Sequence, residues 1–250
     1  MSEGAQLRER LDRVRARIGG AARRAGRSAD EITLVGVAKR QPAERVAAAR
    51  RAGLHCVGES YLQEAQAKIP RVGALLAACG AAPPHWHFVG RLQRNKAREV
   101  ARFFDVVESV DREELGLELE RRAAGRAQPL EVLLQVNVSG EARKGGVAPE
   151  ALPELLAASA RWRRLRVVGL MAIPAAAEDP EASRPAFARL RELRDALRGG
   201  PGAEGLRELS MGMSADFEVA IEEGATWVRV GTALFGARDP GPARASREEE

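Results

Sequence analysis

The chain of 250 residues is 45% hydrophobic and 30% charged, which provides enough apolar material for a complete core beneath a well-solvated surface. This balance excludes a largely disordered chain, and no apolar run approaches the roughly 20 residues that a membrane span needs. The formal charge of +5 comes mainly from arginines scattered among acids, so we expect no nucleic-acid partner. A polar N-terminus and two cysteines without disulfide or zinc spacing predict a cytoplasmic protein.

Segments typical of helices and strands alternate through the first half of the chain. Leu7, Leu11, Val14 and Ile18 form one apolar stripe, which predicts an N-terminal helix extending to about Arg27. An apolar run rich in β-branched side chains then predicts a strand covered on both faces. In order, the elements predicted next are a strand over 32–38, a helix over 41–52, a strand over 54–57, a helix over 61–68, a strand over 86–89, a helix over 93–103, a strand over 106–108 and a helix with Asp111 as its N-cap.

The second half repeats this alternation. About eight strands, nearly all followed by a helix, predict the α/β class and a single (β/α)8 TIM barrel with an extra N-terminal helix. An open doubly wound sheet is the rival, but the chain lacks the glycine-rich nucleotide loops typical of that fold. We expect one barrel domain over 1–238 and a polar tail over 239–250. The predicted elements of this half are a strand over 131–137, a helix over 149–159, a strand over 165–171, a helix over 187–197, a strand over 206–209, a helix over 215–223 and a strand over 226–230.

The cysteines and histidines predict no metal site. Cys56 and Cys79 stand in apolar surroundings, which favours core packing. His85 and His87 alternate onto one strand face, a pattern that can begin a metal site. Because only His55 remains and no acid cluster stands nearby in the sequence, we expect no metal there and a hydrogen-bonded barrel position for His87.

Lys39 ends the first predicted strand. Alternation places Val35, Val37 and Lys39 on one face, so an amine stands at the carboxyl end of an apolar strand, where barrel active sites lie. One interpretation is a lysine that extends from the strand end into water. The other is a desolvated amine with a lowered pKa, suited to attack an aldehyde. Glu59, at the end of the second strand, either contacts Lys39 or caps a helix.

Two loops after the last two strands combine glycine with hydroxyl side chains. One contains Ser210, Gly212 and Ser214, and the other opens with Gly231 and Thr232. Barrels frequently bind phosphate at these two loops, on a helix N-terminus. Helix capping by Ser214 and Thr232 explains either loop taken alone. Two such loops in the expected places favour a phosphate site.

Arg229 shares the face of Gly231 but has apolar immediate neighbours, so its charge needs a partner. One candidate is a pyridine nitrogen, which a guanidinium would keep unprotonated, making the ring a weaker electron sink. The other is a carboxylate of the barrel, such as Glu59 or Glu218. The residue pattern alone leaves both partners open.

The chain resembles a known family, the pyridoxal phosphate homeostasis proteins, which are related to the barrel domain of bacterial alanine racemases. The resemblance extends from about Leu34 to Arg238 and rests on six sequence blocks in the same order. These blocks are Gly36-Val-Ala-Lys39, Val57-Gly-Glu-Ser-Tyr61, His87-Phe-Val-Gly-Arg-Leu-Gln-Arg-Asn-Lys96, Gly169-Leu-Met-Ala-Ile-Pro174, Ser210-Met-Gly-Met-Ser214 and Val228-Arg-Val-Gly-Thr-Ala-Leu-Phe-Gly236.

The resemblance implies a fold-type III barrel that binds pyridoxal 5′-phosphate (PLP). Lys39 would form the Schiff base, the hydroxyl-bearing loops would hold the phosphate, Arg229 would face the pyridine nitrogen, and Met171 would pack near the ring. The cofactor-binding residues that it implies are Lys39, Ser60, Met171, Ser210, Gly212, Ser214, Arg229, Gly231 and Thr232.

Four positions stand out against this family. Ser60 occupies a place near the cofactor where the family usually has Asn, which puts a hydrogen bond from this position in doubt. Arg91 and Arg94 replace commoner small or neutral residues and make their loop unusually basic. Lys144 matches a family lysine. It either takes part in the transfer of the cofactor or is simply a solvated lysine of its loop.

The expected function is that of a monomeric PLP-binding protein without catalytic turnover, which holds or delivers this vitamin B6 cofactor through transient contacts with PLP-dependent enzymes. A PLP-dependent amino-acid racemase is one alternative, and a sugar-phosphate-binding barrel in which Lys39 forms only an ion pair is the other. The related racemases take a second acid/base tyrosine from a separate β-domain. Here Tyr61 is the only tyrosine, its expected role is packing, and no β-domain is expected after the last strand.

Overall fold

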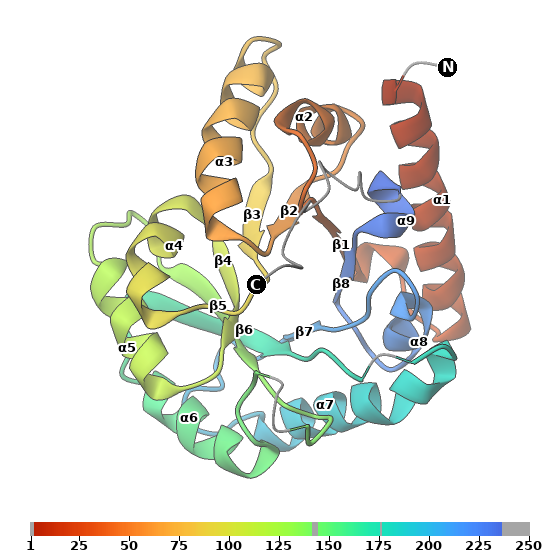
Figure 1. The fold of residues 1–250 in the computed structure, drawn as a ribbon. Helices are drawn as coiled ribbons and strands as arrows, with labels where there is room; N and C mark the ends of the chain where they lie inside the picture. Colours follow the sequence, from red (N-terminus) through yellow and green to blue (C-terminus); the bar gives the residue numbers. More distant parts are fainter. Residues whose placement is uncertain (1–2, 142–144, 176, 237–250) are drawn as a thin grey trace, which may run out of the picture.

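Eight parallel strands close into a barrel in the computed structural model, which describes residues 3–141, 145–175 and 177–236. The strands follow one another in chain order around the barrel, and the last returns to pair with the first, Val35 opposite Arg229 (Figure 1). The predicted (β/α)8 barrel is therefore confirmed. The strands are β1 (Thr33–Val37), β2 (Cys56–Glu59), β3 (His85–Phe88), β4 (Val106–Val110), β5 (Leu130–Gln135), β6 (Leu165–Met171), β7 (Glu208–Ser210) and β8 (Trp227–Val230).

Helices form an outer layer around this ring of strands (Figure 1). Among the described residues, every helix is too short or too polar to cross a membrane. The α-helices are α1 (Glu3–Arg24), α2 (Ala43–Arg51), α3 (Leu62–Ala77), α4 (Ala97–Phe103), α5 (Glu113–Arg122), α6 (Leu152–Ser159), α7 (Arg184–Leu197), α8 (Phe217–Glu222) and α9 (Thr232–Phe235), with 3-10 turns η1 (Ala29–Glu31), η2 (Arg94–Lys96), η3 (Pro149–Ala151) and η4 (Pro180–Ser183).

The extra N-terminal helix α1 is present and packs against α2, α8 and α9 beside the closing strands. Its predicted apolar stripe is buried, with Leu11 fully covered. Arg17 and Arg24 bind Glu218 and Glu222 of α8 at 2.8 and 2.7 Å. These contacts tie the first helix to the strand-seven side of the barrel. The helix ends at Arg24, slightly before the predicted limit.

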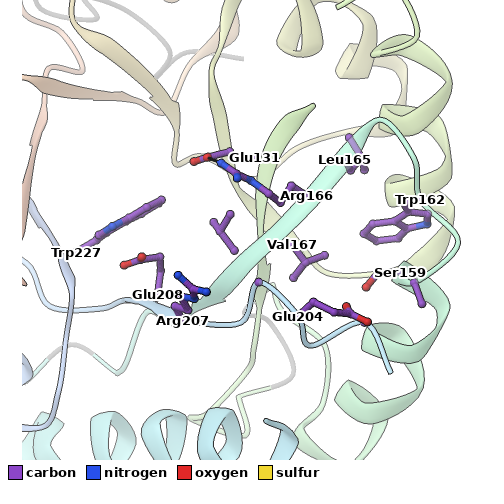
Figure 2. Close-up of a pocket in the computed structure, with 14 residues that line it drawn as sticks. Glu131, Ser159, Trp162, Leu165, Arg166, Val167, Glu204, Arg207, Glu208 and Trp227 are labelled. Atoms are coloured by element: carbon purple, nitrogen blue, oxygen red, sulfur yellow. Dashed lines mark hydrogen bonds and ion pairs between the residues drawn. The ribbon is translucent and has the colours of Figure 1, made fainter. Parts of the chain in front are cut away.

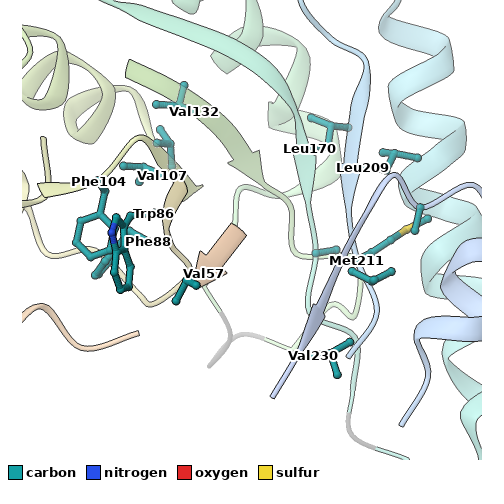
Figure 3. Close-up of a cluster of buried hydrophobic side chains, with 14 of the residues drawn as sticks. Val57, Trp86, Phe88, Phe104, Val107, Val132, Leu170, Leu209, Met211 and Val230 are labelled. Carbon is teal, nitrogen blue, oxygen red and sulfur yellow. The ribbon is translucent and has the colours of Figure 1, made fainter. Parts of the chain in front are cut away.

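Apolar side chains fill two separate layers. The larger layer lies between the strands and the helices, and Figure 3 shows part of it, including Val57, Val107 and Leu209. A smaller cluster fills the inside of the barrel, with Val35 from β1 and Met171 from β6. Successive side chains of a strand point to opposite faces, which explains how each strand supplies both layers.

The third helix is longer than predicted. The Pro in Ile69-Pro70 favours a helix end near Lys68, but α3 continues through Pro70 to Ala77. Two residues beyond the proline, Val72 and Leu76, are fully buried in the outer apolar layer. Burial of this apolar face outweighs the local cost of the proline.

Two further predictions were wrong. Asp111 is not the N-cap of α5, because Arg112 occupies that position and the Asp111 carboxylate instead pairs with the Arg112 guanidinium. Cys79 is exposed in the turn after α3 rather than packed in the core. Cys56 is partly buried and packs against the inner apolar cluster, as predicted. The predicted boundary at residue 238, the polar tail and Lys144 lie outside the described residues.

Candidate functional site

Lys39 lies at the mouth of the barrel, in the turn that follows β1. Its side chain is partly buried and lines a small pocket together with Gly231 and Thr232, which form the junction between β8 and α9. The structure therefore brings together three residues that the sequence analysis chose from opposite ends of the chain. Val37, Gln41, Phe235 and Gly236 complete the lining.

A buried lysine holds the main chain next to Lys39. The Nζ of Lys68, from α3, donates to the Ala38 carbonyl at 2.7 Å, to Glu59 at 2.6 Å and to Glu64 at 2.5 Å. All three donors of this ammonium group are thus used. The network fixes the residue that immediately precedes Lys39.

The same network also fixes the residue that follows. The Arg40 N–H donates to Glu64 at 2.6 Å, and Arg40 adopts a φ of 61°, in the left-handed region that non-glycine residues seldom occupy. Lys39 is therefore held from both sides by contacts to α3. Sequence reasoning missed Glu64 and Lys68 in this role, although their i,i+4 spacing signals an ion pair on one helix face.

Glu59 belongs to this network and does not cap a helix. Burial raises the pKa of its carboxyl from the ordinary value of 4.5 to about 7, although Lys68, and less strongly Lys39, oppose the rise. Its Oε1 accepts from Lys68, whereas its buried Oε2 has no hydrogen-bond partner among the described residues. Glu59 is thus a group that can take up or release a proton close to Lys39.

The two hydroxyl-bearing loops meet at the mouth of the barrel. The Ser214 hydroxyl accepts from the backbone N–H groups of Gly231 at 3.2 Å and Ala233 at 3.4 Å. Gly212 has a φ of 88°, and a Cβ at this position would lie 2.5 Å from the Ala220 side chain. The first loop therefore needs its glycine to pack against the residues of α8 (Phe217–Glu222).

The two helices that follow these loops are short, so their dipoles contribute little to a phosphate site. The helix α8 begins at Phe217 rather than at residue 215, and α9 has only four residues. Their macrodipoles are correspondingly weak. Ser214 caps the start of α9 across the two loops rather than the start of its own helix. Thr232 makes no side-chain capping bond there, since α9 has Gly231 as its N-cap.

Arg229 and Ser210 form a polar network inside the barrel. Arg229 is 4% exposed and donates to the Ser210 hydroxyl at 2.6 Å and to the Ala172 carbonyl at 2.8 Å. The Ser210 hydroxyl in turn donates to Glu108 at 2.6 Å. Arg229 therefore has a carboxylate partner, but it is Glu108, at 3.7 Å, and neither Glu59 nor Glu218.

The network continues from Glu108 to His87. The Nδ1 of His87 lies 2.7 Å from the Glu108 carboxylate, so His87 is hydrogen-bonded inside the barrel as predicted. Burial acts to lower the pKa of His87, but its interactions with Cys56 and Glu108 outweigh burial and raise it to about 9. Burial likewise acts to raise the pKa of Glu108, yet His87, Arg229 and Ser210 hold it below its ordinary value.

Met171 and Ser60 lie on two other sides of the mouth. Met171 ends β6, pairs with Ser210 of β7 and is fully buried in the inner apolar cluster. Ser60 is partly buried after β2, where a Cβ on Gly90 would lie 2.1 Å from its carbonyl oxygen. Gly90 thus allows the loops after β2 and β3 to touch.

A basic groove of about 820 Å³ extends outward from Ser60 between α3 and the loop after β3. Arg91 and Arg94, which the sequence analysis singled out, both line it, together with Lys96 and Arg112. The structure thus gathers the unusual arginines beside Ser60 at the rim of the barrel mouth.

A different pocket lies at the opposite end of the barrel (Figure 2). Its volume is about 490 Å³, and Glu131, Arg166, Glu208 and Trp227 from the first halves of their strands contribute to its wall. Lys39 follows the carboxyl end of β1, so this pocket is separate from the site at the mouth.

Comparison with known proteins places the chain in a family. The family model for the alanine racemase N-terminal domain matches residues 10–239. Curated relatives include the pyridoxal phosphate homeostasis proteins of Pseudomonas aeruginosa and Escherichia coli, which are 48% and 42% identical and align over 94% and 92% of this chain. The alignments cover 97% and 95% of these relatives. The chain belongs to the pyridoxal phosphate homeostasis protein family.

Solved structures agree with the observed barrel. The PipY protein of Synechococcus elongatus, solved with PLP bound, aligns with a TM-score of 0.79 and 33% identity over 92% of this chain and all of that one. The alanine racemase of Corynebacterium glutamicum aligns with a TM-score of 0.61 and 16% identity, over 91% of this chain and 62% of the racemase. The racemase likeness shows a shared fold alone.

Proposed function

We propose that this chain binds PLP as a Schiff base on Lys39 and acts in the homeostasis or delivery of PLP. The observation that carries the proposal is the pocket that Lys39 shares with Gly231 and Thr232 at the barrel mouth. An amine able to attack an aldehyde and donors able to hold a phosphate meet there. The PLP-bound PipY structure of the same family supports this choice of cofactor.

The residues present fit this cofactor. Glu59, whose buried Oε2 has no partner among the described residues, can take up the proton that an ammonium group must lose before it becomes a nucleophile. The Ser214 hydroxyl accepts from the Gly231 and Ala233 N–H groups but keeps its own hydrogen, so this hydroxyl and that of Thr232 are the donors that we propose for a phosphate dianion. Because α8 and α9 are short, these individual donors rather than helix dipoles would hold it.

Bound PLP supplies an aldehyde for a Schiff base and a pyridine ring that can act as an electron sink. We propose that Arg229 faces the ring nitrogen and keeps it unprotonated, since a guanidinium does not give up its proton at neutral pH. The Ser210 hydroxyl is already bound to Glu108 and Arg229. Its proposed role is therefore to orient Arg229, whereas Met171 packs near the ring and Ser60 lies near the cofactor.

The proposal describes a cytoplasmic monomer that holds and releases its cofactor and has no catalytic turnover. The names of its curated relatives support homeostasis. Racemisation needs a second acid/base on the far side of the substrate carbon. Tyr61, the one tyrosine of the chain, is 49% exposed at the start of α3, beyond the pocket of Lys39. Transient contacts with PLP-dependent enzymes would complete delivery.

Borohydride reduction followed by peptide mass spectrometry tests the Schiff base. Reduction of the PLP-loaded protein is expected to fix a pyridoxyl group on the Lys39 peptide. The Lys39→Ala variant should lose this label, and the matched Lys96→Ala variant should keep it. A label confined to Lys144 in the unaltered protein, or a loaded protein without the absorption of a Schiff base, would contradict the proposal. The second result would favour a sugar-phosphate site.

Incubation of the loaded protein with single-enantiomer alanine in deuterated water tests for turnover. We expect no repeated inversion, and at most slow exchange of the Cα hydrogen, because Tyr61 lies beyond the pocket of Lys39 and, among the described residues that line this pocket, no second tyrosine stands opposite the lysine. A general acid or base typically contributes a factor of about 10²–10⁴. Multiple-turnover inversion that disappears in Lys39→Ala would instead make the protein a racemase.

A further inference from the structure

Three metal-ligating side chains meet near the end of the barrel opposite Lys39. Cys56 begins β2 and His85 begins β3, and the register of these strands pairs the two residues directly. His87 follows two residues later on the same face of β3. The sulfur and one ring nitrogen of each histidine all lie within 4.8 Å of one another. This cluster is independent of the function proposed above.

The ring nitrogens of both histidines are placed so that they can coordinate a metal ion. The Nε2 of His87 lies 3.5 Å from the Nδ1 of His85, while the Nδ1 of His87 faces the Glu108 carboxylate at 2.7 Å. That carboxylate orients the ring so that Nε2 turns toward the cluster, and Nε2 provides its lone pair once the proton that it carries in the metal-free protein has left. A histidine held by a carboxylate in this way is typical of metal sites in proteins.

The spacing suits a tetrahedral ion. Zinc binds thiolate sulfur at about 2.3 Å and imidazole nitrogen at about 2.0–2.1 Å, so neighbouring ligand atoms lie about 3.3–3.7 Å apart. The two ring nitrogens already have such a separation. The remaining separations, up to 4.8 Å, would have to shorten by about an ångström, which rotation of the side chains can supply.

The cluster can be reached from solvent. His85 is exposed and Cys56 is partly buried. The Trp227 ring packs against His87, with ring centroids 5.0 Å apart, and also lines the pocket of Figure 2. Glu131, in the same pocket, interacts electrostatically with His85. Water can therefore occupy a fourth coordination position.

We propose that Cys56, His85 and His87 form a binding site for Zn²⁺ or a similar borderline-soft divalent cation, with water as the fourth ligand. A mixed sulfur and nitrogen set favours such ions over Mg²⁺ or Ca²⁺, which prefer oxygen. On binding, the Cys56 thiol and the Nε2 of the protonated His87 ring each release a proton to solvent, while the Nδ1 of His87 keeps its proton toward Glu108 and His85 binds as a neutral ring. The sequence analysis predicted no metal here because it found only His55 and no acid cluster nearby, and it did not consider Cys56 with the histidines, although strand register places Cys56 beside His85.

Cobalt provides a coloured probe for this site. The full chain, stripped of metal with a chelator, is titrated with Co²⁺, and spectra are recorded as differences from the metal-free protein. We expect saturation at one equivalent, with a thiolate-to-cobalt charge-transfer band and visible bands of tetrahedral cobalt. Subsequent Zn²⁺ should displace the cobalt and remove both signals.

The chain offers a matched control for each type of ligand. Cys56→Ser should abolish the charge-transfer band, and His85→Gln should weaken binding of Co²⁺ and Zn²⁺ by at least about tenfold. Cys79→Ser and His55→Gln alter the other cysteine and the remaining histidine, and they should bind as the unaltered chain does. If circular dichroism shows that Cys56→Ser does not fold, His85→Gln still tests the site, because a substitution at the exposed His85 should leave the fold intact.

Two results would overturn the proposal. One is the absence of saturable binding near one equivalent in the unaltered chain. The other is binding that Cys56→Ser and His85→Gln leave unchanged or that Cys79→Ser abolishes, because either pattern would assign the cation to a different place.

Discussion

At the scale of single residues, the surroundings of a charged group decide what it can do. Glu59 and Glu44 are both carboxylates beside a basic partner, yet burial raises the pKa of Glu59 to about 7. For the exposed Glu44, bonds from its own backbone and from Arg71 lower the pKa. The sign of the shift follows from desolvation, which penalises only the buried charge.

The raised pKa of Glu59 predicts how stability depends on pH. The folded protein holds this proton more tightly than the unfolded chain, so the stabilisation is complete below about pH 4.5 and is lost as pH rises through about 7. The shift corresponds to about 3 kcal/mol at most. The Glu59→Gln variant cannot ionise at this position. The difference in free energy of unfolding, variant minus unaltered protein, should therefore increase as pH rises from about 5 to 8.

Urea unfolding across this pH range measures the difference. Glu44→Gln is the control, and it should show no such gain with rising pH, because the Glu44 pKa is shifted in the opposite direction. Parallel pH profiles for Glu59→Gln and the unaltered protein would show that Glu59 does not titrate as described.

At the scale of elements, α3 is the support of the candidate site. It contributes Lys68 and Glu64, which hold the residues on either side of Lys39. The buried residues of α3 share the outer apolar layer with Val57 of β2, and Lys68, 5% exposed along its side chain, reaches Glu59 at the end of that strand. The helix thereby transmits the rigidity of the barrel to a turn at its mouth.

Removal of Lys68 should therefore destabilise the fold. Lys68→Met leaves Glu59 buried and unpaired, and breaking a buried pair in this way costs about 3–5 kcal/mol. Lys96→Met, at a partly exposed lysine in η2, is the matched control and should change the free energy of unfolding by less than about 0.5 kcal/mol.

The double variant Glu59→Gln/Lys68→Met separates loss of the pair from loss of packing. It should recover part of the stability, because the unpaired charge is gone. Equal unfolding free energies for the single and double variants in denaturant titrations at pH 8 would contradict the ion-pair explanation.

At the scale of the whole molecule, the barrel brings two different chemistries to its two ends. The mouth of the barrel contains Lys39 and the two hydroxyl-bearing loops, and the opposite end contains the cluster of Cys56, His85 and His87. Between them runs the polar network from His87 through Glu108 and Ser210 to Arg229. Closure of eight strands is what places residues from β3, β4, β7 and β8 around one interior.

Ligand binding at the mouth should stabilise this whole unit. At 100 times its dissociation constant, PLP would add about 2.7 kcal/mol, which for a chain of this size raises Tm by roughly 5–10 °C. Pyridoxal without its phosphate should give little of this shift, since several donors converge on the phosphate. Calorimetric scans with each compound measure the difference, and equal shifts would contradict the phosphate role of the Ser214 and Thr232 loops.

Local patterns in the sequence were sufficient for most of the fold and for the position of Lys39. The apolar stripe of α1, the apolar run of β1 and the eightfold alternation depend on neighbouring residues, so their periodicity can be read directly along the chain. The same holds for glycine and hydroxyl side chains in the loops after β7 and β8. The length of α3 could not be predicted, because its continuation past Pro70 depends on burial against the barrel.

Only the tertiary structure decided which side chains are partners. No local pattern predicts three of the pairings that the structure shows. Arg229 pairs with Glu108, the main chain beside Lys39 binds Lys68, and His85 lies beside Cys56. Each pairing depends on strand register or on how a helix packs, and a shift of one residue would turn these side chains to the opposite face. The sequence by itself thus determined the elements and the place of Lys39, whereas closure of the barrel determined which charged and polar groups surround it.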